Sequence, residues 1–399
     1  MDWANPARQG GQHAHNLALV ARLIAGHGPV SRAELAKRSA LTKTTVTQLV
    51  GELLDAGLVR ELGTTRHSGP GRPATHLVLN VSGPVGVGLQ VEADHVAGCV
   101  LDLTGRVRDR ALRRVDDVRG DPAASVKAAE PVLRRLLASA DAQDSVVAGI
   151  AVGVPGRVDA EGRVRSVELD WRDVPLSGLL LRRLESLSGG LIPVTVHDTF
   201  RLTALAEWWF GPGDVVPPLL VVGGELSLGI GVVEDGDSWD RGPVGPLGHV
   251  RVRRNGGLCR CGARGCLDTV AGPRALLRTA APETPVTSRL PGGDGRMRAL
   301  ARSAAPESET ALRRAASALG DALAGLSVVC EPARVVLGGH LAALGTEFAD
   351  QVAGELGRRR PGDTPPVSVS TLGGDAVALA AAATVTRRLV ENPARWLAS

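Results

Sequence analysis

Apolar side chains recur with a helical period through the first sixty residues of the chain. One stripe predicts a helix over residues 12–27, ended by Gly26 and Gly28, and its apolar members are Leu17, Leu19, Val20, Leu23 and Ile24. Ser31 and Glu34 have the spacing of a capping box, which predicts a short helix that reaches Arg38. A second stripe predicts a longer helix over residues 43–56, capped by Thr42, whose buried face is Val46, Leu49, Val50, Leu53 and Leu54.

Two segments after these helices alternate as strands do, over residues 58–62 and 75–79, and they flank a polar loop over residues 63–74. Helix, short helix, turn, helix and hairpin indicate a winged helix-turn-helix, whose third helix enters the major groove of DNA. The candidate DNA-binding residues are Lys43, Thr44, Thr47 and Gln48 on the third helix, with Arg66 and Arg72 on the loop. A helical module that contacts another protein is the alternative.

Past Asn80 the pattern changes to apolar strands that alternate with amphipathic helices. Strands are expected over residues 85–91, 95–103, 146–152, 219–222, 229–234 and 334–337. Helices are expected over residues 123–140, 273–279, 309–329 and 375–390. Two α/β halves with similar strand–turn–strand openings indicate a duplicated architecture.

The net charge of +4 is concentrated in one part of the chain. Residues 1–80 hold nine Lys and Arg against five Asp and Glu, so they carry the whole positive excess. A basic module on a neutral body favours a polyanion partner such as double-stranded DNA. No run of 18 apolar residues occurs, and the first residues lack the apolar core of a signal peptide, so a cytoplasmic location is expected.

Three of the five cysteines lie close together, at Cys259, Cys261 and Cys266, and His249 precedes the first of them by ten residues. Three thiolates and one imidazole make the donor set of a closed tetrahedral zinc site. Four protein ligands leave no open position for a catalytic water, so the site is expected to be structural. A cysteine-bearing loop that holds no metal is the alternative.

This cysteine-rich stretch resembles the paired motif of the ROK family, which comprises repressors, uncharacterised reading frames and sugar kinases. The chain reads Gly242-Pro-Val-Gly245-Pro246-Leu-Gly248-His249, and then Cys-x-Cys-Gly-x-x-Gly-Cys-x-Asp268. Pro246 and Asp268 each stand where the family has Glu.

The resemblance covers essentially the whole chain and implies an α/β fold: a winged helix-turn-helix over residues 1–80, then a two-lobed actin-like ATPase fold over residues 81–399. Lobe one is expected over about residues 81–200 together with the last helix, 375–390. Lobe two, which carries the zinc site, is expected over about residues 201–374.

Both segments that resemble the phosphate-binding turns of the family's kinases have gained carboxylates. The first turn reads Asp-x-Gly-x-Thr in the kinases, whereas this chain has Gln90-Val-Glu92-Ala-Asp94. Two carboxylates beside a phosphate are expected to repel it by about 1–4 kcal/mol each at 4 Å. The second turn has gained Glu225.

The segment that resembles the family's catalytic motif lacks its general base. Aligned without gaps on Leu205-Ala206-Glu207, Thr199 takes the place of the catalytic Asp, and Asp198 takes that of the Asn before it. A threonine hydroxyl is not basic enough to take a proton near neutral pH. The alternative is a one-residue deletion, which would place Asp198 at the base.

The residues that resemble the family's sugar site are partly rewritten. Glu168 stands where family members have Asn, and Pro246 offers no side-chain acceptor. The candidate ligand-binding residues are Glu168, Asp198, His249 and Asp268. A pocket that has drifted after losing its ligand is the alternative.

These features together predict a DNA-binding transcriptional regulator of the ROK type, a repressor rather than an activator, without kinase activity. The expected partners are an operator in double-stranded DNA, a second copy of the chain (a homodimer or a dimer of dimers) and a small-molecule effector in the cleft between the lobes. Two alternatives stay open: a sugar kinase with an appended DNA-binding domain, and a DNA-binding regulator that responds to no ligand.

Overall fold

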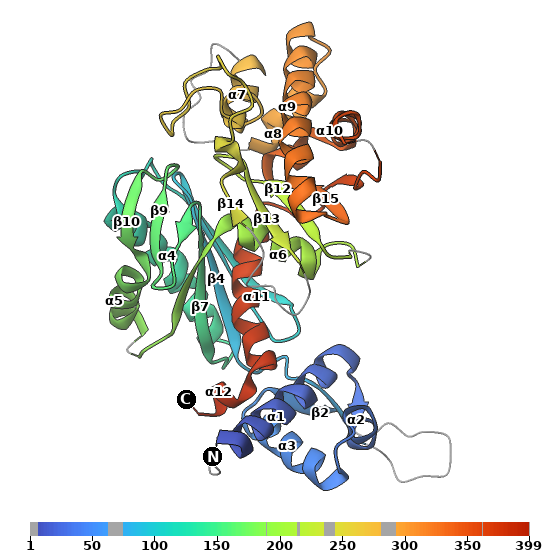
Figure 1. Ribbon diagram of the computed structural model, residues 1–399. Helices are drawn as coiled ribbons and strands as arrows, with labels where there is room; N and C mark the ends of the chain where they lie inside the picture. The colour runs from blue at the N-terminus through green and yellow to red at the C-terminus, as the bar shows by residue number, and fades with distance from the viewer. Residues whose placement is uncertain are drawn as a thin grey trace, which may run out of the picture.

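The structure, a computed structural model, describes residues 7–62, 75–188, 190–213, 216–234, 244–280, 293–360 and 362–398. It contains a helical amino-terminal module and two α/β lobes, and a carboxy-terminal helix runs from between the lobes to the module (Figure 1). Among the described helices, none combines the length and the apolar character needed to cross a membrane.

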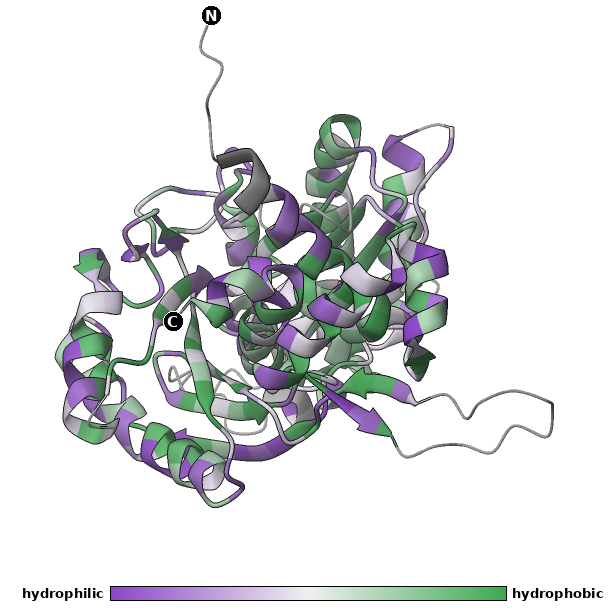
Figure 2. Ribbon diagram, turned by 90° about the horizontal axis from the view of Figure 1, so that it is seen from below, coloured by the Kyte–Doolittle hydropathy of each residue, from purple (hydrophilic) through white to green (hydrophobic). Residues whose placement is uncertain are grey.

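The amino-terminal module is a winged helix-turn-helix, as predicted. Its helices are α1 Ala7–His27, α2 Arg32–Ser39 and α3 Lys43–Asp55. Its strands β1 Val30–Ser31, β2 Val59–Leu62 and β3 His76–Leu79 form a sheet in the order β1-β3-β2. Figure 2 shows apolar and polar residues alternating along its helices, as expected for helices that bury one face.

The predicted helix caps are present. The Ser31 hydroxyl accepts a hydrogen bond from the Glu34 amide at 3.3 Å, and the Glu34 carboxylate accepts one from the Ser31 amide at 2.9 Å. The Thr42 hydroxyl accepts one from the amide of Thr45 at 3.2 Å. Ala40 ends α2 in the left-handed region, at φ 59°. A non-glycine residue there costs about 1 kcal/mol, which the surrounding packing must offset.

Lobe one is built on a sheet in the order β11-β7-β4-β5-β6. Its strands are β4 Val85–Val91, β5 His95–Leu101, β6 Val107–Arg114, β7 Val147–Val154 and β11 Val194–Asp198. Helices α4 Pro122–Asp141 and α5 Leu176–Ser188 pack against this sheet. A small sheet in the order β10-β9-β8 completes the lobe, with strands β8 Arg157–Val158, β9 Arg163–Ser166 and β10 Trp171–Pro175.

Lobe two repeats the same topology, in the order β14-β13-β12-β15-β16. Its strands are β12 Leu219–Gly223, β13 Gly229–Val233, β14 Val244–Gly245, β15 Arg334–Leu337 and β16 Val367–Val369. Its helices are α6 Thr199–Phe210, α7 Pro273–Ala280, α8 Gly293–Ala301, α9 Pro306–Cys330 and α10 Thr346–Arg359, with short 3₁₀ turns at Leu247–His249, Leu267–Thr269 and Gly339–Leu344. Read from β6 in lobe one and from β14 in lobe two, each sheet has two antiparallel pairings followed by two parallel ones. This shared pattern confirms the duplicated architecture.

Helix α11 Ala376–Glu391 lies against β4, β5, β7 and α6. It approaches the sheet so closely that a Cβ atom on Gly88 would lie 1.9 Å from the Ala378 carbonyl oxygen. The close contact therefore requires glycine on β4 and small residues on α11. From the cleft, α11 runs to α12 Pro393–Leu397, beside α1 (Figure 1).

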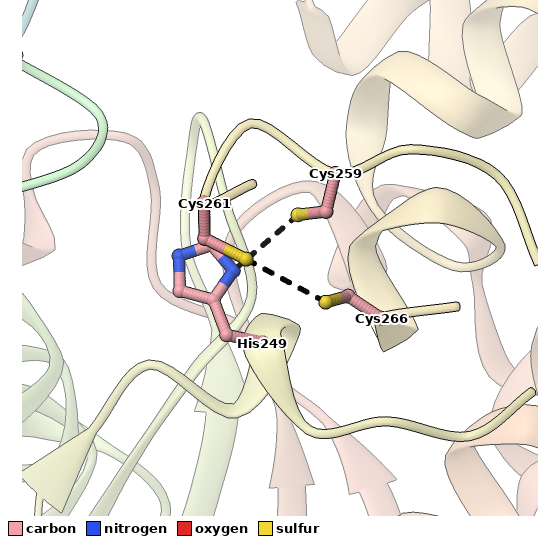
Figure 3. A group of neighbouring side chains, drawn as sticks. All are labelled: His249, Cys259, Cys261 and Cys266. Carbon is pink, nitrogen blue, oxygen red and sulfur yellow. Dashed lines mark hydrogen bonds between the residues drawn. The ribbon is translucent and has the colours of Figure 1, made fainter. Parts of the chain in front are cut away.

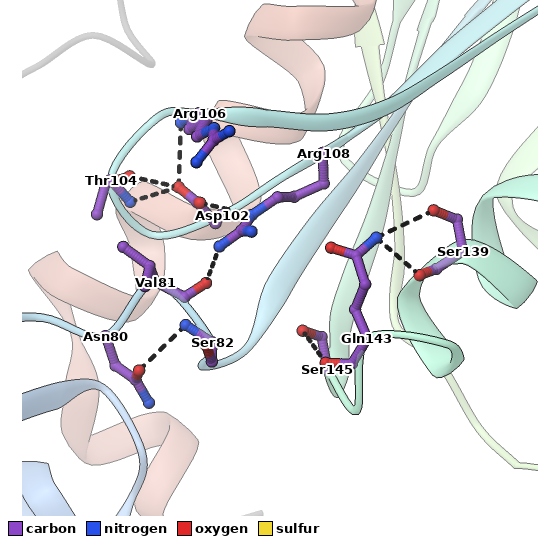
Figure 4. A network of polar contacts seen from close by, with 10 residues as sticks. All are labelled: Asn80, Val81, Ser82, Asp102, Thr104, Arg106, Arg108, Ser139, Gln143 and Ser145. Carbon is purple, nitrogen blue, oxygen red and sulfur yellow. Dashed lines mark hydrogen bonds and ion pairs between the residues drawn. The ribbon is translucent and has the colours of Figure 1, made fainter.

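The module is fixed to lobe one by hydrogen bonds and by a shared core. Leu103 and Leu389 join the apolar cluster formed by α1, α2 and α3. The Trp396 indole N–H donates to the Ala56 carbonyl at 3.3 Å, and the Asn80 side-chain amide donates to the Gly57 carbonyl at 2.9 Å. Arg108 bridges buried Asp102, at 2.7 Å, and the Val81 carbonyl (Figure 4).

Candidate DNA-binding face, metal centre and interlobe cleft

The four predicted recognition residues lie on the exposed face of α3. Lys43, Thr44, Thr47 and Gln48 are all exposed, while Val46, Leu49, Val50 and Leu53 on the other face are buried. The Thr47 hydroxyl donates to the Lys43 carbonyl at 2.8 Å, and the Gln48 amide donates to Glu52 at 3.4 Å. The side chains of Lys43 and Thr44 are therefore exposed to a partner at the start of the helix. The Gln48 side chain is held only by its long hydrogen bond to Glu52. Arg66 and Arg72 lie outside the described residues.

His249, Cys259, Cys261 and Cys266 converge, as predicted, on one point of lobe two (Figure 3). All their ligand atoms lie within 4.8 Å of one another. The Cys261 and Cys266 sulfurs are 3.7 Å apart, and the Cys259 sulfur is 3.6 Å from Nδ1 of His249. With Zn–S near 2.3 Å and Zn–N near 2.0–2.1 Å, the edges of a tetrahedral zinc site are about 3.8 Å and about 3.6 Å. The cluster therefore fits such an ion.

The backbone of this loop is folded tightly around the cluster. The Cys259 amide donates to the Ala263 carbonyl at 2.8 Å, and the Gly262 amide donates back to the Cys259 carbonyl at 3.0 Å. Gly265 has φ 76°, and a Cβ atom there would lie 1.7 Å from the Arg253 carbonyl oxygen. Only glycine can fill that position, directly before Cys266.

Two of the predicted ligand-binding residues, Glu168 and Asp268, lie beside this cluster. The Glu168 carboxylate comes from lobe one and lies 3.6 Å from Nε2 of His249, the ring nitrogen that faces away from the sulfurs. A carboxylate in this place orients a metal-binding imidazole. Asp268 accepts hydrogen bonds from the Ser227 hydroxyl at 2.6 Å and the Leu228 amide at 2.9 Å, so it ties the metal loop to the β12–β13 turn.

A cleft of about 240 Å³ lies between the lobes. Its charged lining residues are Glu92, Glu168, Glu207, Glu225 and Arg298. The volume is below the roughly 300–1,000 Å³ of most small-molecule sites. Glu207, on α6, accepts a hydrogen bond from Ser370. The buried polar residues that lobe one contributes to the cleft include Gln90, Glu92 and Glu168.

Glu92 is fully enclosed, and this changes one expectation from the sequence. The Glu92 side chain is 3% exposed, and burial raises its pKa to about 8. Its carboxyl group is therefore mostly protonated at pH 7, so it does not repel a phosphate as a full charge would. Asp94 is paired with His95 at 2.8 Å, which reduces its repulsion as well. What still opposes a nucleotide is the small volume and the remaining carboxylates.

The segment that resembles the catalytic motif forms the start of α6. Thr199 is the first residue of this helix and lines the cleft. Asp198 caps the helix, accepting a hydrogen bond from the Phe200 amide at 2.6 Å, and burial raises its pKa to about 7. The carboxylate of Asp198 is thus engaged by the helix backbone, which is a structural task for a buried acid.

Two protein families match different parts of the chain, the ROK body and the amino-terminal module. The profile of the ROK family matches residues 86–386, and that of the MarR family matches residues 18–72. The xylose repressor of Bacillus subtilis (strain 168) is 27% identical over 66% of this chain and 67% of its own length. The DNA-binding transcriptional repressor Mlc of Escherichia coli (strain K12) is 28% identical over 66% of this chain and 64% of its own length. The chain thus spans about two thirds of the length of such curated relatives.

Solved structures give the same picture of the fold. A ROK family transcriptional regulator, described as a homologue of the E. coli Mlc protein, superposes with a TM-score of 0.75 over 97% of this chain and 100% of its own, at 23% identity. A ROK family glucokinase from Streptomyces griseus, in complex with glucose and AMPPNP, has a TM-score of 0.61 over 75% of this chain and 98% of its own, at 25% identity. Because the family profile covers about three quarters of the sequence, the chain belongs to the ROK family.

Proposed function

We propose that the chain is a cytoplasmic, DNA-binding transcriptional regulator, a repressor that has lost phosphoryl transfer. The observation that carries the proposal is the exposed polar face of α3, on a winged helix-turn-helix that is fixed to the ROK body. A helix presented in this way fits the major groove, with residues of its first turns at the base edges. Repression is the simpler outcome, because a bound protein blocks a promoter without any further contact.

The metal cluster supports a structural role for zinc within this function. The donor set is three cysteines and one histidine, and the distances between its ligand atoms match a tetrahedral site. Bound zinc would crosslink residues 249–266 and hold Asp268 against the β12–β13 turn at the cleft. Glu168, in lobe one, would orient the His249 imidazole, so that the metal site also takes part in the contact between the lobes.

A kinase is disfavoured by the residues at the cleft. Thr199 offers no carboxylate to take a proton, and Asp198 caps α6. The cleft of about 240 Å³ is small for a sugar together with a nucleotide.

The twofold symmetry of most DNA-binding modules of this kind favours a homodimer, or a dimer of dimers, on a palindromic operator.

Replacing Lys43 or Gln48 with Ala is expected to weaken operator binding without unfolding the module, because both side chains are exposed. If Gln48 reads an adenine edge, its loss costs about 1–3 kcal/mol at one base position and relaxes specificity there. Lys127→Ala, an exposed lysine on α4, is the matched control and should leave the affinity unchanged. Titration of labelled operator measures all three variants; unchanged affinity for both helix variants would show that α3 does not read DNA.

A further inference from the structure

The lobe-one wall of the cleft holds two buried oxygen atoms that lack a hydrogen-bond partner. They are Oε1 of Gln90 and Oε2 of Glu92, in side chains that are 1% and 3% exposed. The Gln90 amide donates to the other Glu92 oxygen at 3.2 Å, which fixes both side chains in place. Buried acceptors without partners are costly in a folded protein, and they mark a place where a donor is missing.

Both side chains line the cleft, and most of the ionisable groups around them are acidic. Glu92, Glu168, Glu207 and Glu225 face a single lining cation, Arg298, among the described residues. A ligand with several N–H donors and a positive charge matches such a wall. The cation would replace the proton that Glu92 holds without a ligand, and a charged donor to the resulting buried carboxylate makes a strong hydrogen bond. An anionic ligand would meet acceptors and like charges.

A small metal ion is a poorer match for the same wall. Metal ions need three or more ligand atoms close together, at about 2.0–2.6 Å from the ion. Within the part of the chain that the structure describes, the one group of carboxylate, imidazole and thiolate ligands that close is the cluster at His249. A metal ion therefore does not account for the unpartnered oxygens of Gln90 and Glu92, and an organic donor is the better match.

We propose that the cleft is a binding site for a small organic amine, no larger than a monosaccharide, whose ammonium group donates to Oε2 of Glu92 and Oε1 of Gln90. This inference rests on the proposed function, since it names the chemical class of the effector. The amine enters between the lobes and contacts lobe two at the Glu225–Ser227 turn. That turn is joined through Asp268 to the metal loop, so that binding draws both lobes onto one ligand.

The test compares amines with neutral molecules of the same shape by isothermal titration at pH 7. The pairs are ethanolamine and ethylene glycol, putrescine and 1,4-butanediol, and glucosamine and glucose. The wild-type chain should bind at least one amine about tenfold more tightly than its hydroxyl counterpart, a difference of about 1.4 kcal/mol. Glu92→Gln and Gln90→Leu should each abolish that preference. Glu347→Gln, at an exposed glutamate on α10, should retain it.

Each outcome decides the inference separately from the proposed function. If no amine binds below about 10 mM, or the neutral molecules bind equally well, the amine site does not exist. The same holds if Glu92→Gln keeps the preference for the amine. Operator titration of the same preparations stays independent: DNA binding without amine binding sinks this inference alone, and amine binding without DNA binding sinks the proposed function alone.

Discussion

Cys261→Ser is expected to release the bound metal and to unfold the loop over residues 249–268. A structural zinc site couples metal binding to folding, with apparent binding free energies of about 10–16 kcal/mol in small zinc domains. The loss of one ligand should therefore lower the stability of the loop by several kcal/mol. Backbone hydrogen bonds also hold the loop, among them those from Cys259 to Ala263, Gly265 to Gly257 and Leu267 to Val250, and they have to hold it alone once the metal is lost. Metal analysis should find about one zinc per chain in the wild type and almost none in the variant.

Cys330→Ser is the matched control, because Cys330 is a half-buried cysteine at the end of α9, away from the cluster. It should keep its zinc and its melting temperature. Carefully prepared wild-type protein that binds DNA and contains no zinc would contradict the metal assignment.

The wild-type protein is expected to lose stability as the pH rises, and the Glu92→Gln substitution is expected to remove this loss. Burial raises the pKa of Glu92 to about 8 in the folded chain, against its ordinary value of 4.5 in the unfolded chain. Between these values the folded state holds a proton that the unfolded state has lost, so stability falls as pH rises from about 5 to 8. One pKa unit corresponds to about 1.4 kcal/mol, so the free energy of unfolding of the wild type at pH 8 should be about 4 kcal/mol lower than at low pH. The glutamine of the variant does not titrate, so the variant should not show this decrease.

The groups facing Glu92 also shape this titration. Asp94, His95 and Glu225 lie near it, and burial is the largest cause of the raised pKa. Urea unfolding at pH 5 and pH 8 should show the variant gaining stability over the wild type mainly at pH 8. Glu347→Gln, at an exposed site, should show no such difference. An equal effect at both pH values would mean that Glu92 is already ionised in the folded protein.

The helix-turn-helix and the metal cluster were predictable because their signals are local. Ser31 with Glu34, and Thr42 before α3, carry their own capping chemistry within one turn of helix. The three cysteines lie on one tight loop, so their convergence needs little of the rest of the fold. Six strands of the two large sheets could be predicted for the same reason, since each is a short apolar run between turns: β4, β5, β7, β12, β13 and β15. Strands β6, β11, β14 and β16 were not predicted.

Other features depend on the folded chain and were not predicted. Helix α6 buries residues on several faces, so it shows no clear apolar stripe, and its sequence resembled only a catalytic motif. Helix α10 was missed although Phe348, Val352 and Leu356 do form a stripe. The contact of Glu168 with His249 joins two lobes, and the protonation of Glu92 follows from burial between them, which no local pattern reveals.

The most direct test of the central claim is footprinting of the full chain on the DNA upstream of its own gene. We expect protection of two half-sites about 10–10.5 base pairs apart, or a multiple of that spacing, in a roughly palindromic sequence. Protection should weaken steeply with salt, by a slope near −0.9 for each phosphate contacted, and it should be lost at the same bases in Lys43→Ala and Gln48→Ala. Uniform, sequence-independent protection, or none in zinc-loaded protein, would contradict a DNA-binding regulator.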